Sequence, residues 1–183
     1  MIYLTGDFMS DLIDEIMNRR SIRKFKSDMV PKEDIDKIIK AGLYAPSGRG
    51  LQSPIIIAVT NKEFRDKLAT VNRKFVGFPE YLDPFYNGPV VLIVLADKST
   101  HTHVYDGSVV MENLLLAASG LGYGSIWIHR AKEEFEMDEY KKVLKDLGID
   151  GDYEGIGHCV IGYIDEDIPE AAPRKDNRVY YID

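Results

Sequence analysis

Two stretches of the chain are apolar without interruption, and they predict strands that are covered on both faces. They are residues 55–59, Ile-Ile-Ile-Ala-Val, and residues 90–96, Val-Val-Leu-Ile-Val-Leu-Ala. A half-covered strand alternates apolar and polar residues, whereas a short continuous apolar run indicates a strand with both faces buried. We expect further strands at 125–128 and 158–164. The tail residues 179–182 are apolar enough to add to a sheet, including that of a neighbouring subunit.

Apolar residues at helical spacing predict helices between these strands. Ser10 is a suitable N-cap for a first helix, whose apolar residues are Leu12, Ile13, Ile16 and Met17. Pro31 opens a second helix that ends before Pro46. Further helices are expected at about 62–69 and 132–147. The helix expected at 106–121 has so little polarity that we expect it to be buried nearly all round, as the central core helix or a subunit interface.

Two segments lack any period. Residues 1–9 are expected to form a loose leader, and the aromatic-rich residues 71–88 a long loop near a functional site, with a surface lid of no ligand role as the alternative. The chain shows no repeat or linker, and 183 residues suit one well-buried domain. We therefore expect a single domain over residues 1–183.

Charge and composition narrow the choice of partners. The 23 Lys and Arg residues against 30 Asp and Glu give a net charge of −7, which argues against a nucleic-acid or anionic-membrane binder. No apolar run approaches the roughly 18 to 20 residues of a membrane helix, and no signal peptide is visible. The expectation is a soluble, cytoplasmic protein. The single cysteine, Cys159, lies in an expected strand and is interpreted as a structural thiol.

A basic cluster at the end of the first helix carries the main candidate chemistry. Residues 19–23 read Arg-Arg-Ser-Ile-Arg. Guanidinium groups fit phosphate oxygens and stay charged, and a serine hydroxyl adds a donor. The alternative is that the arginines complement the dipole of the helix they close. A second basic pair, Arg174-Lys175, and the loop Pro46-Ser47-Gly48 favour a phosphate site with distant contributors.

Three other signals are rejected. The glycines of residues 120–124 follow a helix, whereas a dinucleotide fingerprint needs a strand before it and a helix after it. His101 and His103 have poor spacing for a metal pair and indicate a surface turn. His158 has no nearby serine or aspartate motif, so a catalytic triad is unsupported.

Read together, four segments resemble the nitroreductase family of FMN-dependent oxidoreductases. They are residues 19–25, residues 45–47 with Gln52, residues 124–128 and residues 173–175. The resemblance implies an α+β fold, a nitroreductase-like three-layer sandwich with a central, mostly antiparallel sheet flanked by helices. It also implies a homodimer that seats two FMN molecules between the subunits, with a C-terminal arm at about 166–183 reaching toward the partner.

The resemblance also assigns roles to residues of this chain. It implies that the phosphate is bound by Arg19, Arg20, Ser21 and Arg23, with help from Arg174 and Lys175. It implies that Pro46, Ser47 and Gly48 contact the flavin from the other subunit, and Gln52 belongs to the same motif. It places the backbone of Ile128 and His129, next to Trp127, beside the flavin N5. A His129 ring that faced the flavin could tune its potential, with a backbone role alone as the alternative. The chain departs from the family at Gly50 and at Ser53-Pro54.

The implied activity has two half-reactions. NADH or NADPH reduces FMN, and the flavin then reduces a small-molecule acceptor such as a nitro compound or a quinone. The flavin performs the chemistry, so no catalytic side chain and no metal are expected. One alternative is a flavin-binding redox sensor or flavin carrier without turnover. Another is a member specialised in dehalogenation or in flavin destruction.

Overall fold

Strand β2 (Val90–Asp97) runs through the middle of a four-stranded antiparallel sheet of order β1-β2-β4-β3. The computed structural model describes residues 6–183, with side chains from residue 12 onward. The other elements are α1 (Gly6–Asn18), α2 (Lys32–Leu43), the short 3-10 helix η1 (Gly48–Gly50), β1 (Pro54–Val59), α3 (Lys62–Val76), α4 (His103–Gly120), β3 (Gly124–Ile128), α5 (Ala131–Phe135), α6 (Asp138–Asp146) and β4 (Tyr153–Gly162).

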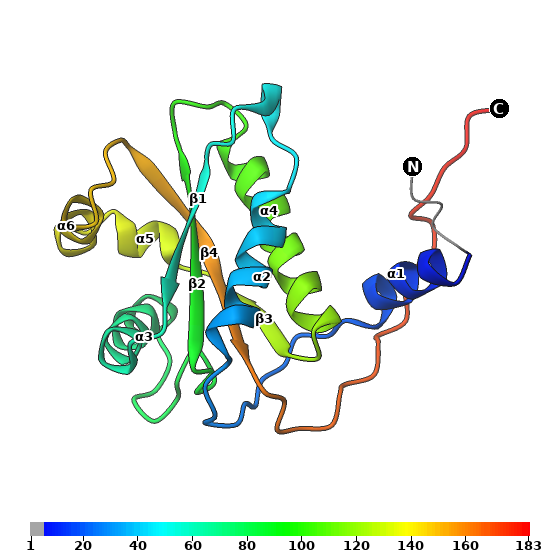
Figure 1. Ribbon diagram of the computed structural model, residues 1–183, viewed down its shortest axis with the longest axis horizontal. Coiled ribbons are helices and arrows are strands. Elements are labelled where there is room, and N and C mark those ends of the chain that lie inside the picture. The colour runs from blue at the N-terminus through cyan, green and yellow to red at the C-terminus, as the bar shows by residue number, and fades with distance from the viewer. Residues whose placement is uncertain (1–5) are drawn as a thin grey trace.

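Helices cover both faces of the sheet, which makes three layers (Figure 1). Helices α2 and α4 lie on one face, and α3, α5 and α6 lie on the other. Alternate residues of β2 enter the two cores: Leu92 and Val94 pack with the α2 and α4 side, and Ile93 and Leu95 with the opposite side. The expected α+β sandwich with a mainly antiparallel sheet is confirmed.

The strand expectations are confirmed for β2 and need correction for β1. Every β2 residue from Val90 to Ala96 is buried. Strand β1 instead lies at the edge of the sheet, with Ala58 exposed and residues 55–57 half-buried. Apolar composition alone does not distinguish an edge strand from a central one. Strand β4 also begins earlier than expected, at Tyr153.

Several helix boundaries differ from the expectations. Helix α1 begins at Gly6, so Ser10 is inside the helix and residues 6–9 are not a leader, while residues 1–5 lie outside the described part. Helix α3 runs to Val76, where Gly77 ends it in the left-handed conformation with φ 76°. The loop expected at 71–88 is therefore confined to residues 77–89. The helix expected at 132–147 is two helices, because Met137 adopts an extended backbone.

The 77–89 loop is anchored by a buried arginine of α3. Arg65 is 6% exposed, donates from Nε to the Gly88 carbonyl at 3.1 Å and pairs through Nη2 with Asp83. Its guanidinium also lies 5.5 Å from the centre of the Phe85 ring. A buried arginine with these partners holds the loop against the body. The second half of the loop is thus packed against the body, whereas residues 77–82 are exposed. The loop residues line neither of the cavities described in the next section.

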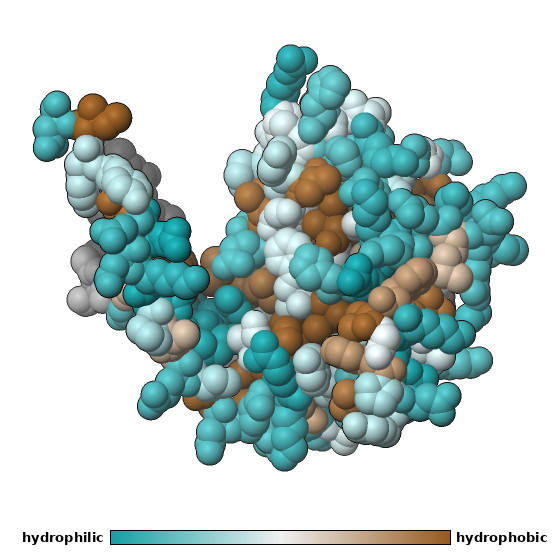
Figure 2. Space-filling view, turned by 180° about the vertical axis from the view of Figure 1, so that it is seen from behind, coloured by the Kyte–Doolittle hydropathy of each residue, from teal (hydrophilic) through white to brown (hydrophobic). Residues whose placement is uncertain are grey.

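Among the apolar side chains that remain exposed in the single chain are groups on α1, on α4 and on the C-terminal tail. On α1, Leu12, Ile13, Ile16 and Met17 are each about half exposed, and on the tail Val179, Tyr180, Tyr181 and Ile182 are largely exposed. Helix α1 and the C-terminal arm (residues 166–183) project from the body, as Figures 1 and 2 show. Helix α4 is buried along one side only, because Val104, Tyr105 and Val109 are exposed. Within one chain the tail forms no strand among the described residues.

Candidate functional site

The segment after α1 is attached to the first strand residues of β3. Ser21 forms a parallel bridge with Ser125, and the Ile22 amide donates to the Ser125 carbonyl at 3.1 Å. Further along, Phe25 bridges Ile164, and the Asp165 amide donates to the Lys24 carbonyl at 3.0 Å. These contacts bring the beginning of the C-terminal arm beside the segment that follows α1. The remainder of the arm can therefore return toward the arginines.

The two basic patches that the sequence analysis singled out meet at one cavity. This basic cavity has a volume of about 760 Å³. Its lining includes Arg19, Arg20 and Ser21 from the end of α1 and Pro173 and Arg174 from the C-terminal arm. Three guanidinium groups and a hydroxyl from distant parts of the chain thus share one hollow surface. Such a donor set suits a phosphate or another compact anion.

Two of the arginines keep buried donors without a partner. Arg19 Nη1 and Arg20 Nε are buried and have no hydrogen-bond partner within the described residues. Arg20 Nη1 donates to the Met17 carbonyl at 2.7 Å, so this arginine also caps the last turn of α1. Arg19 Nε lies 3.9 Å from Glu112 Oε1. Capping explains part of the cluster, whereas the unpartnered nitrogens leave room for an anion.

Arg23 and Lys175 do not line the basic cavity of the single chain. The Arg23 amide donates to the Glu166 carboxylate, and its exposed guanidinium reaches the Ser21 carbonyl at 3.2 Å. Lys175 lines a separate cavity of about 530 Å³ on the arm, together with Arg174 and Arg178. The structure therefore brings together Arg19, Arg20, Ser21 and Arg174 from the expected set.

A second cavity lies at the other end of β3. This β3-end cavity has a volume of about 610 Å³ and is lined by Val104, Ser108, Trp127, His129, Arg130, Lys132, Glu133, Glu154, Gly155 and Ile156. Its lining is partly apolar, and Trp127 Nε1 is buried without a partner among the described residues. His129 lies four residue steps beyond Ser125, which is about 13 Å at roughly 3.3 Å per residue of extended chain. Strand β3 thus connects the two cavities.

The loop that follows α2 is organised by one buried aspartate. Asp106, 4% exposed, accepts from the Gly48 amide at 3.0 Å, from Ser53 Oγ at 3.2 Å and from Thr102 Oγ1 at 3.0 Å. The loop contains positive φ angles at Arg49 (55°), Gly50 (68°) and Gln52 (50°). Pro46, Ser47, Gly48 and Gln52 line neither cavity of this chain. The loop lies at the top of the view in Figure 1, apart from α1.

A polar cluster that sequence reasoning missed lies directly behind the end of β3. Asn72, Glu134 and His158 are each 0% exposed. His158 Nε2 lies 2.7 Å from Glu134 Oε2, and Asn72 Nδ2 donates to Glu134 Oε1 at 2.7 Å. The remaining contacts go to β3: His158 Nδ1 to the Ile128 carbonyl at 3.2 Å and Asn72 Nδ2 to the His129 carbonyl at 2.7 Å. Single polar residues within amphipathic helices carry no pattern that reveals such a cluster.

The described residues contain neither a candidate metal centre nor a helix that could cross a membrane. Within residues 6–183, no group of three or more His, Cys, Asp or Glu residues has an arrangement that could hold a metal ion. None of the helices in that range is both long and apolar enough to cross a membrane. Cys159 is buried in β4, and burial raises the pKa of its thiol above the ordinary value. The interpretation of Cys159 as a structural thiol agrees with this position.

Comparison with known proteins identifies the fold and the family. The family model described as the nitroreductase family matches residues 16–163. A protein of Methanothermobacter thermautotrophicus, provisionally named NADH dehydrogenase/NAD(P)H nitroreductase, is 36% identical over 121 residues, which are 64% of this chain and 60% of that protein. This chain thus spans less than two thirds of that relative's length.

Two solved structures share the architecture. A nitroreductase with bound FMN from Bacteroides fragilis has a TM-score of 0.83 at 24% identity, covering 94% of this chain and 99% of that one. An FMN-dependent nitroreductase from Clostridium difficile has a TM-score of 0.71 at 31% identity, covering 92% and 98%. The residues that the family model matches include the arginines after α1, all four strands and the loop after α2. The chain belongs to the nitroreductase family.

Proposed function

We propose that the chain is an FMN-dependent oxidoreductase that takes electrons from NADH or NADPH and passes them to a nitro compound, a quinone or a similar acceptor. Family membership supports this proposal, as do the similarity to an FMN-dependent nitroreductase of Clostridium difficile and the NAD(P)H in the name of the Methanothermobacter relative. The observation that carries it is the basic cavity, where Arg19, Arg20 and Arg174 meet and buried guanidinium nitrogens remain unpartnered.

The residues present fit the two ends of an FMN molecule. Arg19, Arg20, Ser21 and Arg174 would hold the phosphate through charge-assisted hydrogen bonds. Trp127 and His129 would border the flavin ring at the β3-end cavity, to which Val104 and Ile156 contribute apolar surface. Bound FMN would supply hydride exchange at N5. The protein contributes binding, orientation and a partly dry surface, and no side chain is assigned a bond-making role.

The assembly that we propose is a homodimer. The apolar side chains on α1, on one side of α4 and on the tail are exposed in the single chain, and a second copy would cover them. A partner would also bring its own residues 46–52 to a cavity that this chain's loop does not reach. Ile13→Glu places a charge on the apolar side of α1, so we expect a shift toward monomer in analytical ultracentrifugation. Glu15→Gln, on the same helix, is the control, and an unchanged dimer in Ile13→Glu would contradict this role of α1.

Anaerobic mixing tests the activity against the alternative of a flavin carrier. The FMN-loaded protein is mixed with NADH or NADPH under argon, and the flavin absorbance is followed. Rapid bleaching, reversed when a quinone or nitro compound is added, is the expected result. A flavin band that persists with both nucleotides would support a carrier or sensor and contradict the proposed turnover.

A further inference from the structure

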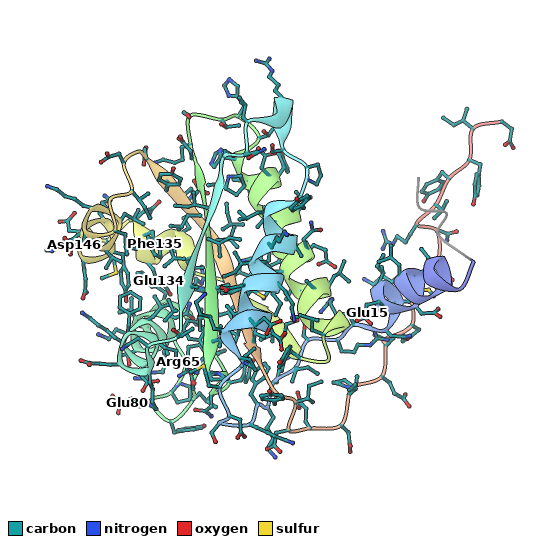
Figure 3. The ribbon with its side chains drawn as sticks, viewed as in Figure 1. Glu15, Arg65, Glu80, Glu134, Phe135 and Asp146 are labelled. Atoms are coloured by element: carbon teal, nitrogen blue, oxygen red, sulfur yellow. The ribbon has the colours of Figure 1, made fainter. Side chains whose placement is uncertain are left out.

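The buried polar cluster behind β3 contacts two consecutive backbone carbonyls, those of Ile128 and His129. We propose that Asn72, Glu134 and His158 form a positioning network that fixes the 128–130 peptides, so that the His129 amide faces the β3-end cavity as a donor to the flavin. This proposal rests on the proposed function. Figure 3 labels Glu134 on α5, on the face of the sheet that α3 also covers. The three side chains come from α3, α5 and β4 and converge on the end of β3.

The direction of the peptides follows from the carbonyl contacts. The Ile128 carbonyl accepts from His158 Nδ1, and the His129 carbonyl accepts from Asn72 Nδ2. The described chain contains no cis peptide bond, and in a trans peptide the N–H and C=O groups point to opposite sides. With both carbonyls turned toward the network, the amides of His129 and Arg130 face away from it. The cavity that His129 and Arg130 line also includes Val104 and Ser108 of α4, which covers the opposite face of the sheet from α3 and α5.

The hydrogen-bond partners of His158 determine how many protons the His158–Glu134 pair holds. The Ile128 carbonyl can only accept, so His158 Nδ1 carries a proton. The 2.7 Å contact between His158 Nε2 and Glu134 Oε2 holds one more proton, on the nitrogen or on the oxygen. In both arrangements the pair has no net charge. The four hydrogen bonds therefore persist with the pair as an ion pair or as two neutral groups.

A strained residue lies immediately after the two held carbonyls. Arg130 adopts φ 83°, in the left-handed region that non-glycine residues rarely enter. Such strain is unfavourable and persists only where the surroundings enforce it. A fully buried carboxylate–imidazole pair is also costly compared with apolar side chains of similar volume. Two unfavourable features at the end of one strand indicate a requirement for this peptide orientation.

The test compares four variants of the FMN-loaded protein. His158→Leu removes the donor to Ile128, and Asn72→Leu removes the donor to His129. Glu134→Gln can keep every hydrogen bond, because its amide can accept from Asn72 and donate to a His158 ring protonated on Nδ1. Tyr140→Phe is the matched control, since the buried Tyr140 hydroxyl has no hydrogen-bond partner within the described residues.

The readouts are the FMN dissociation constant, from flavin fluorescence quenching, and the ¹⁵N chemical shift of N5 in labelled FMN bound to the oxidised protein. For His158→Leu and Asn72→Leu we expect about tenfold weaker binding, as for one lost hydrogen bond, and an N5 signal displaced toward that of a flavin without a donor at N5. Glu134→Gln and Tyr140→Phe should keep the parent signal. Either leucine variant suffices if the other does not fold.

The outcomes separate this proposal from the one it rests on. A parent N5 signal in a folded leucine variant would overturn the positioning network while leaving FMN binding intact. A displaced signal in Glu134→Gln would also overturn it, because the hydrogen-bond geometry would then not be the determinant. A parent protein that binds no FMN would instead overturn the proposed function, and the network's role with it.

Discussion

Arg19 and Arg174, which come from opposite ends of the chain, line the same cavity at the start of β3. The pairing of residues 24–25 with 164–165 makes this possible, because it turns the C-terminal arm back toward α1. The arrangement concentrates positive charge on a protein whose net charge is −7. A local basic cavity on an acidic protein favours a small anion over an extended polyanion.

Replacing either arginine should release FMN. Arg19→Ala and Arg174→Ala are each expected to weaken binding by about 1.5–3 kcal/mol, the range for a hydrogen bond to a charged group. Because both side chains would contact the same phosphate, the double variant should lose less than the sum of the single losses. Isothermal titration with FMN measures all three.

Lys74→Ala removes a positive charge from an exposed residue of α3 and serves as the control for net charge. Its affinity should equal that of the parent protein. An unchanged affinity in both arginine variants would remove the phosphate assignment. Additive losses in the double variant would contradict a shared ligand group.

Asp106→Asn should loosen the loop after α2. The carboxylate accepts three hydrogen bonds, from Gly48, Ser53 and Thr102, and the amide offers one acceptor oxygen in place of two. We expect a loss of about 1.5–3 kcal/mol in the free energy of unfolding, measured in urea. Amide hydrogen exchange at Gly48 should also become faster. Glu112→Gln, at an exposed position of α4, is the control, and equal stability of the two variants would contradict the role of Asp106.

Tyr123→Phe should reveal a pH-dependent link between α2 and the turn that follows α4. Tyr123 Oη donates to Asp34 Oδ2 at 2.7 Å, and this bond, with a further one from Lys37, lowers the pKa of the Asp34 carboxyl below its ordinary 3.8. A carboxyl with a lowered folded-state pKa stabilises the protein above the unfolded-state pKa, and this stabilisation is lost as the pH falls through the folded-state value. The Tm difference between parent and variant should therefore be present at about pH 7 and shrink below about pH 4. A difference that stays equal across this range would contradict the link.

Arg65→Ala should destabilise the fold through the 77–89 loop. Removing the guanidinium leaves Asp83 and the Gly88 carbonyl without their buried partner. The loss of one member of such a pair costs on the order of 3–5 kcal/mol. Chemical denaturation measures the cost, and Lys74→Ala, an exposed position on the same helix, is the control. A loss below about 1 kcal/mol would show that the loop is held by its apolar contacts instead.

Part of the fold could be read from the sequence because its signals are local. The β2 run is apolar at every position from Val90 to Ala96, and such a run has few other interpretations. The edge position of β1 could not be predicted, because the spacing of apolar residues indicates burial but does not indicate which strands lie on either side. The sequence predicts a helix that is shorter than α3, because the buried side of the second half of α3 carries Asn72, and a polar residue is ordinarily expected to be exposed.

The candidate site divides in the same way. The convergence of Arg19, Arg20 and Ser21 with Arg174 was predicted from residue type, and the shared cavity agrees with it. Their binding of phosphate stays a prediction. The Glu134–His158 pair could not be predicted, because a glutamate in the amphipathic 132–147 stretch is ordinarily solvated and its partner lies on a distant strand.

The most direct test of the account is a titration of the purified parent protein with FMN, followed by gel filtration and an absorbance spectrum of the protein peak. We predict that one FMN per chain stays with the protein and that its fluorescence is quenched. A protein peak that remains colourless after incubation with excess FMN would contradict the central claim that the basic cavity and the end of β3 form a flavin site.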